Sequence, residues 1–109
     1  MIIREWRGRA DAARTEAYAA HFRTVVLPDL QRVPGFAGAC LCQRRLGFTV
    51  EILVLTRWRS MEALRGFAGA AVEKAVVEPG AAAALIDFDA NAQHYEVVEE
   101  VPPPAGGEG

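Results

Sequence analysis

Few side chains in this sequence combine a reactive group with a position that a fold would bury. The chain has 2 histidines, His21 and His94. Tyr18 precedes His21 by three residues, so on a helix the two side chains lie about one turn apart and could form a polar pair. Because imidazole titrates near neutral pH, His21 is a candidate base for a substrate proton. The alternative is a neutral histidine that is hydrogen-bonded in the core.

The two cysteines do not indicate a metal or redox centre. Cys40 and Cys42 are two residues apart in a predicted strand, which points both side chains to one face and is a poor geometry for a disulfide. No histidine or third cysteine lies nearby in sequence to complete a tetrahedral metal site. A glycine-rich phosphate loop and a nucleophile elbow are also missing from the sequence. We expect buried, unreactive thiols, no metal and no cofactor.

The composition is typical of one globular domain. Its 109 residues are 51% hydrophobic and 24% charged, with a formal net charge of −2. This balance gives no basic surface for nucleic acid, and no apolar run approaches the roughly 18 residues that cross a membrane. The first residues alternate like a strand and lack the features of a signal peptide, so we expect a cytoplasmic protein.

The order of the predicted elements is β–α–β–β–α–β. Alternation and composition predict four strands, at residues 1–9, 36–45, 49–58 and 91–100. The tight connection between the second and third strands favours an antiparallel hairpin over an open parallel sheet. The sequence therefore predicts a ferredoxin-like α+β fold, a four-stranded antiparallel sheet with helices on one face.

Helical spacing of apolar residues predicts the segments between the strands. The first helix covers residues 12–33, is capped by Asp11, and should kink or restart at Pro28. Ser60 is a good N-cap for a second helix at 61–69. Residues 70–88 predict one or two further helical pieces, broken at the Glu-Pro-Gly sequence that begins at residue 78.

The third strand is apolar on both of its faces. Val50, Ile52, Val54 and Trp58 share one face, whereas Leu53 and Leu55 lie on the other with Glu51 and Arg57. The helices of one subunit can cover only one face of the sheet, and exposed leucines would favour aggregation. We therefore predict a two-fold symmetric homodimer in which sheet packs against sheet. The alternative is a set of scattered surface leucines.

Three segments carry a resemblance to a known family: "LPDLQRVPGFAGACL", "EILVLTRWRSMEALRGFAG" and "HYEVV". Over roughly residues 1–100 the chain resembles the antibiotic biosynthesis monooxygenase domain family, in the dimeric α+β barrel superfamily. The remaining residues, 101–109, are rich in proline and glycine and are predicted to be disordered. The resemblance implies a homodimer with a pocket between the sheet and the helices of each subunit.

The best-known activity in this family is oxygenation of polycyclic aromatic phenols without metal or flavin. The resemblance thus implies an enzyme that deprotonates a small aromatic substrate, whose anion then reacts with dioxygen. Trp58 matches the family's W-x-S tryptophan, which lines the pocket, although a core aromatic is the alternative. With Trp58 we assign His21 and Tyr18 to catalysis. Four residues are assigned to substrate binding: Phe22, Val54, Phe67 and His94.

Two alternatives remain open at the level of the sequence. His94 matches a histidine in the family's terminal motif, and it is an interface residue if its strand face is the dimer face. Haem-degrading members carry an axial histidine after the tryptophan motif, and residues 70–79 contain none, so we expect no haem degradation. The competing hypothesis for the whole protein is a small-molecule-binding or stress-responsive dimer without turnover, because the sequence has no dense polar cluster.

Overall fold

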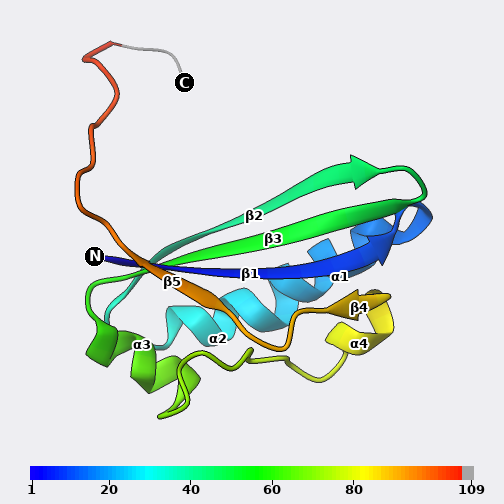
Figure 1. The fold of residues 1–109 in the computed structure, drawn as a ribbon, viewed down its shortest axis with the longest axis horizontal. Coiled ribbons are helices and arrows are strands. Elements are labelled where there is room, and N and C mark those ends of the chain that lie inside the picture. Colours follow the sequence, from blue (N-terminus) through cyan, green and yellow to red (C-terminus); the bar gives the residue numbers. More distant parts are fainter. Residues whose placement is uncertain (107–109) are drawn as a thin grey trace.

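Three long strands form the body of an antiparallel sheet in the computed structural model, which describes residues 1–106 (Figure 1). They are β1 (Ile2–Asp11), β2 (Phe36–Leu46) and β3 (Thr49–Trp58). The strand order is β2-β3-β1-β4, and β5 also pairs with β1. The helices lie along one side of this sheet (Figure 1). The predicted ferredoxin-like α+β architecture is therefore confirmed.

The predicted last strand, 91–100, is present only as the shorter β5 (Gln93–Glu96), which pairs with residues 2–5 of β1. A further short strand, β4 (Asp87–Phe88), pairs with Gly8 and Arg9 and lies in the segment that the sequence predicts to be helical. Between them, Ala90 accepts a hydrogen bond from the Ala75 N–H, and the Ala92 N–H donates to Glu73. Residues 90–92 thus pair with the loop before α4, which interrupts their pairing with β1.

A nearly continuous helical run connects β1 to β2. It consists of four consecutive elements: η1 (Ala12–Arg14), α1 (Thr15–His21), the π-helical turn η2 (Phe22–Val26) and α2 (Leu27–Gln31). Asp11 accepts a hydrogen bond from the Ala13 N–H and so caps the start, as predicted. Pro28 has no N–H and its ring crowds the preceding turn, and the wider π turn before it accommodates the ring. The irregularity predicted at Pro28 is therefore present as a π-helical turn, and the helical run continues through it.

Buried side chains alternate along β3 from Val50 to Trp58, as the sequence predicts. They pack against α1, η2 and α2 on one side of the molecule and against α3 (Met61–Ala68) at one end. The Ser60 hydroxyl accepts from the Ala63 N–H at 3.1 Å and caps α3. Leu53 and Leu55 face the opposite side of the sheet, which the helices leave uncovered.

The structure corrects two predictions about local structure. Of the one or two helical pieces predicted within 70–88, one is present, the short α4 (Ala81–Ala84) after the Glu-Pro-Gly sequence, and residues 70–80 are irregular. The loop bonds to the 90–92 segment instead of forming its own helical hydrogen bonds. Cys40 is exposed and Cys42 half-buried, with their sulfurs 3.5 Å apart on the uncovered face. They are therefore not core thiols in the single chain.

No helix among the described residues is long and apolar enough to cross a membrane. The domain boundary at residue 100 stays a prediction. Of the predicted disordered segment, 101–109, residues 107–109 lie outside the described part of the chain.

Candidate active site

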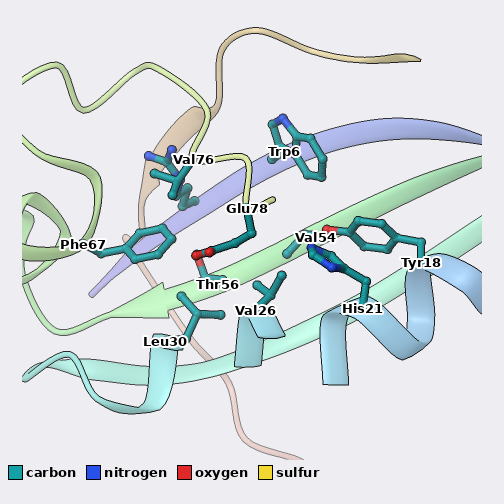
Figure 2. A pocket seen from close by; sticks show the side chains of 11 residues that line it. Trp6, Tyr18, His21, Val26, Leu30, Val54, Thr56, Phe67, Val76 and Glu78 are labelled. Carbon is teal, nitrogen blue, oxygen red and sulfur yellow. The ribbon is translucent and has the colours of Figure 1, made fainter. Parts of the chain in front are cut away.

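A small cavity lies between the sheet and the helices, closed by the loop between α3 and α4 (Figure 2). Its wall is largely apolar and includes residues from β1, β3, the helical run and the loop. The lining residues are Arg4, Trp6, Tyr18, His21, Val26, Leu30, Val54, Thr56, Phe67, Val76 and Glu78. The space open to water is about 40 Å³. At roughly 10–15 Å³ for each water, that is room for on the order of three water molecules.

The structure brings His21 and Tyr18 together in this wall (Figure 2). They lie in α1, and their ring centroids are 5.7 Å apart. His21 Nε2 is buried and is the one buried side-chain nitrogen or oxygen without a hydrogen-bond partner in the described part of the chain. Burial raises the pKa of Tyr18 to about 12, so its phenol stays protonated at neutral pH. The pair therefore offers a free ring nitrogen on His21 beside a proton donor on Tyr18.

The loop supplies a carboxyl group to the same cavity. The Glu78 side chain extends from the loop toward Thr56 and Val26 (Figure 2). Burial raises the pKa of Glu78, and a hydrogen bond with Asp29 and its negative charge raise it further. Glu78 is thus a carboxyl group that occupies space a ligand would need.

Arg4 of β1 places a buried cation in the wall. It is 4% exposed, and its guanidinium donates to the Val72 carbonyl at 2.6 Å and to the Lys74 carbonyl at 2.7 Å. His94 Nε2 lies 2.8 Å from Arg4 Nη1. Because a guanidinium has no acceptor, His94 Nε2 must be the acceptor, which requires a neutral imidazole. Burial, and then the Arg4 charge, lower the pKa of His94, in agreement with this neutral form.

Trp58 does not lie in the cavity wall, contrary to the expectation from the family motif. It is 0% exposed and stacks on Phe67 at 5.4 Å, with the edge of Phe36 at 5.5 Å. Its indole N–H donates to the Thr56 hydroxyl at 2.9 Å. The physical reason is its position at the end of β3, beneath α3, where Leu30 and Leu64 enclose it. Trp58 therefore supports two wall residues, Thr56 and Phe67, from behind.

The four residues assigned to substrate binding divide between wall and core. Val54 and Phe67 line the cavity. Phe22 is 7% exposed and packs in the core outside the lining. His94 lies on the covered face of the sheet and contacts the cavity through Arg4. Its strand face is thus the face toward the helices, and not the uncovered face where a partner sheet would pack.

The sequence interpretation missed four polar or aromatic wall residues: Arg4, Trp6, Thr56 and Glu78. A signal existed for Thr56, because it lies in phase between Val54 and Trp58 on β3. Arg4 and Trp6 also share a strand face, but β1 has polar residues on both faces, so its pattern does not identify the buried side. Glu78 had no signal, since the path of an irregular loop depends on distant contacts.

No group of three or more potential metal-ligating side chains occurs among the residues that the structure describes. The cavity wall combines groups that can exchange a proton, hydrogen-bond donors and acceptors, and one positive charge with a largely apolar lining. Such a set can hold a small aromatic molecule and manage one of its protons.

The fold and the cavity define an α+β protein with a largely apolar cavity between the sheet and the helices. The sequence model of the family described as antibiotic biosynthesis monooxygenase matches residues 1–79, and the chain belongs to this family. Among curated proteins, no sequence relative of the chain was found.

Several solved structures share the fold of this chain. A Bacillus cereus protein classed as an antibiotic biosynthesis monooxygenase matches with a TM-score of 0.66 and 15% identity, covering 93% of this chain and 96% of that one. SnoaB, a cofactor-independent oxygenase from Streptomyces nogalater, matches with a TM-score of 0.58 and 13% identity, over 93% and 97% of the two chains. A MhuD variant with two manganese protoporphyrin IX molecules per active site has a TM-score of 0.60 and 18% identity, over 94% and 99%. At these identities the likeness concerns the fold.

Proposed function

We propose that this protein is a cofactor-independent monooxygenase that acts on a small aromatic phenol bound in the cavity. The observation that supports this best is the unpartnered, buried Nε2 of His21 beside the protonated Tyr18 phenol. A buried polar atom without a partner costs free energy, so a ligand hydroxyl that bonds to it would be favoured. Membership of the monooxygenase family and the fold shared with a cofactor-independent oxygenase support the same reaction class.

The proposed reaction begins when His21 Nε2 accepts the substrate proton. The resulting anion is electron-rich and transfers one electron to dioxygen, and the two radicals then combine with formation of a carbon–oxygen bond. Tyr18 donates a hydrogen bond to the peroxide that forms. Loss of water breaks the oxygen–oxygen bond and leaves a carbonyl, so that a ring CH2 and O2 give C=O and H2O. The protein's contribution is proton transfer, orientation and exclusion of bulk water.

The cavity must widen before such a substrate can enter. Its open space of about 40 Å³ is far below the roughly 300–1,000 Å³ of ordinary ligand pockets. The loop is the wall that can move, because Val76 is 38% exposed and Glu78 enters the cavity from it. Its neighbouring residues 72–75 are held by Arg4 and by the 90–92 segment. We therefore place the entrance at residues 76–80.

The uncovered sheet face supports a homodimer as part of the proposal. Ile3, Leu53, Leu55 and Tyr95 lie on it, and Tyr95 is 48% exposed. Equilibrium sedimentation at micromolar concentration should give about twice the chain mass of 11.8 kDa. A mass of a single chain would contradict the dimer, and it would leave the cavity and its chemistry unaffected because the cavity is on the opposite face.

Oxygen consumption with a panel of anthrones and hydroquinones tests the activity. His21→Ala should reduce uptake by about 100-fold, because removing a general base typically costs 10²–10⁴ in rate. Arg23→Ala is a matched control, since Arg23 lies two residues after His21, is exposed and does not line the cavity. Both variants should keep the wild-type circular dichroism spectrum. Uptake that His21→Ala leaves unchanged would exclude the proposed base. Binding of these compounds without oxygen uptake would favour the competing hypothesis, a small-molecule-binding protein without turnover.

A further inference from the structure

The Arg4 guanidinium has donors and charge that the protein itself does not satisfy. A guanidinium carries five N–H groups. Three contacts are made: Nη1 with Val72 and His94, and Nη2 with Lys74. The Nε–H and one Nη2–H have no partner among the described residues. Free guanidinium N–H groups are donors that a carboxylate can accept.

Arg4 also forms no direct ion pair with a carboxylate among the described residues. Glu78, which has the one carboxyl group among the described residues of the cavity wall, is not within ion-pair distance of it. The neighbours of Arg4 are two carbonyls and a histidine that must be neutral in order to accept. Burial lowers the pKa of Arg4, which reflects the cost of keeping the cation there. A buried charge without a partner is unusual in a purely structural role, because a neutral donor could hold the same two carbonyls at lower cost.

The surroundings of Arg4 fit an aromatic ligand. The Arg4 guanidinium carbon lies 5.9 Å from the centre of the Phe67 ring, and both residues line the cavity. Trp6 lies on the same strand face as Arg4 and also lines the cavity, with its indole N–H already bonded to the Asp89 carbonyl. Phe67 and Trp6 thus give the cavity an aromatic wall near Arg4, which suits a ligand that joins a ring to a charged group.

We infer that the cavity takes an aromatic carboxylate, whose carboxyl group accepts hydrogen bonds from the free N–H groups of Arg4 and whose ring lies beside Phe67 and Trp6. His94 is a positioning residue in this site, since it holds Arg4 through Nη1 without contact to the ligand. This inference deepens the proposed function by naming the substrate class of the same cavity. The acid group serves as an anchor, and the phenol of the same molecule is the group that His21 deprotonates.

Calorimetric titration with 1-hydroxy-2-naphthoate and its carboxamide tests the anchor. The two compounds share size and ring, and at neutral pH they differ in charge. The wild type should bind the acid at least about tenfold more tightly than the amide, the factor that corresponds to about 1.4 kcal/mol. Arg4→Gln should abolish this preference while leaving the affinity for the amide within about twofold. Arg65→Gln should preserve it, because Arg65 is exposed on α3 and outside the cavity.

Several results would overturn the inference. They are equal binding of acid and amide by the wild type, no measurable binding of the acid, and an equal loss of both affinities in Arg4→Gln. If Arg4→Gln does not fold, the ratio of the wild-type affinities for the acid and the amide still tests the inference. Oxygen uptake is measured separately. Turnover of neutral phenols without a binding preference for the acid would refute the role of Arg4 in carboxylate binding and leave the monooxygenase proposal intact. Tight binding of the acid without turnover of any phenol would refute the monooxygenase proposal and leave the role of Arg4 intact.

Discussion

Replacement of Trp58 by phenylalanine separates a core role from a pocket role for this residue. The indole is fully buried and makes one hydrogen bond, to the Thr56 hydroxyl. Phenylalanine keeps an aromatic ring between Phe36 and Phe67 but has no N–H. We expect Trp58→Phe to destabilise the protein while its affinity for 1-hydroxy-2-naphthoate stays within about threefold of the wild type, about 0.7 kcal/mol.

The expected loss of stability follows from three contributions. The missing hydrogen bond costs about 1 kcal/mol. The smaller ring leaves a cavity of roughly 40 Å³, which at about 24 cal/mol per Å³ adds about 1 kcal/mol. The apolar area that is no longer buried adds a further contribution of about 1 kcal/mol at about 25 cal/mol per Å². The free energy of unfolding should therefore fall by about 2–4 kcal/mol.

Urea unfolding followed by far-ultraviolet circular dichroism measures this change. It is carried out at one fixed protein concentration, because the proposed dimer would make stability depend on concentration. Trp6→Phe is the matched control, since Trp6 is a tryptophan of the cavity wall. It should weaken binding of 1-hydroxy-2-naphthoate more than Trp58→Phe does. A variant at Trp58 that retains wild-type stability and loses ligand affinity more than tenfold would refute the core assignment.

Three further predictions concern other parts of the molecule. Burial raises the pKa of Tyr18 to about 12, so Tyr18 of the unfolded chain ionises at a lower pH than in the folded protein. The free energy of unfolding should therefore fall by up to about 2–3 kcal/mol as pH rises from 10 to 12. Urea unfolding at each pH should show a smaller fall for Tyr18→Phe, and an equal fall in the variant and the wild type would contradict the prediction. Gly35→Ala should destabilise by more than about 2 kcal/mol, because φ is +89° and the new Cβ would lie 2.4 Å from that of Ala63. Gly47→Ala, with φ +66° and no atom within 4 Å, should cost about 1 kcal/mol in the same unfolding assay, and equal losses would refute the steric argument. Glu78→Ala should tighten binding of 1-hydroxy-2-naphthoate at least about threefold in the calorimeter by emptying part of the cavity, and weaker binding would show that Glu78 contributes to the site.

The sequence by itself determined the elements whose signals are local. Period-two alternation gave β3 its bounds, Thr49–Trp58, and its buried face. The Ser60 cap and the irregular turn at Pro28 also follow from the chemistry of single residues. The proximity of Tyr18 and His21 also follows from the sequence, because residues three apart on a helix lie about one turn apart.

The tertiary structure decided what depends on contacts between distant segments. Alternation identifies the buried face of β3, but it does not tell which buried residue meets a cavity. In the folded chain Thr56 lines the cavity, whereas Trp58 on the same face is enclosed beneath α3. The segment at 70–80 has helix-forming residues, yet its backbone bonds to Arg4 and to residues 90–92. Those pairings bring together groups from opposite ends of the chain. They place Arg4 against the loop and Glu78 in the cavity wall, and neither placement follows from a periodicity in the sequence.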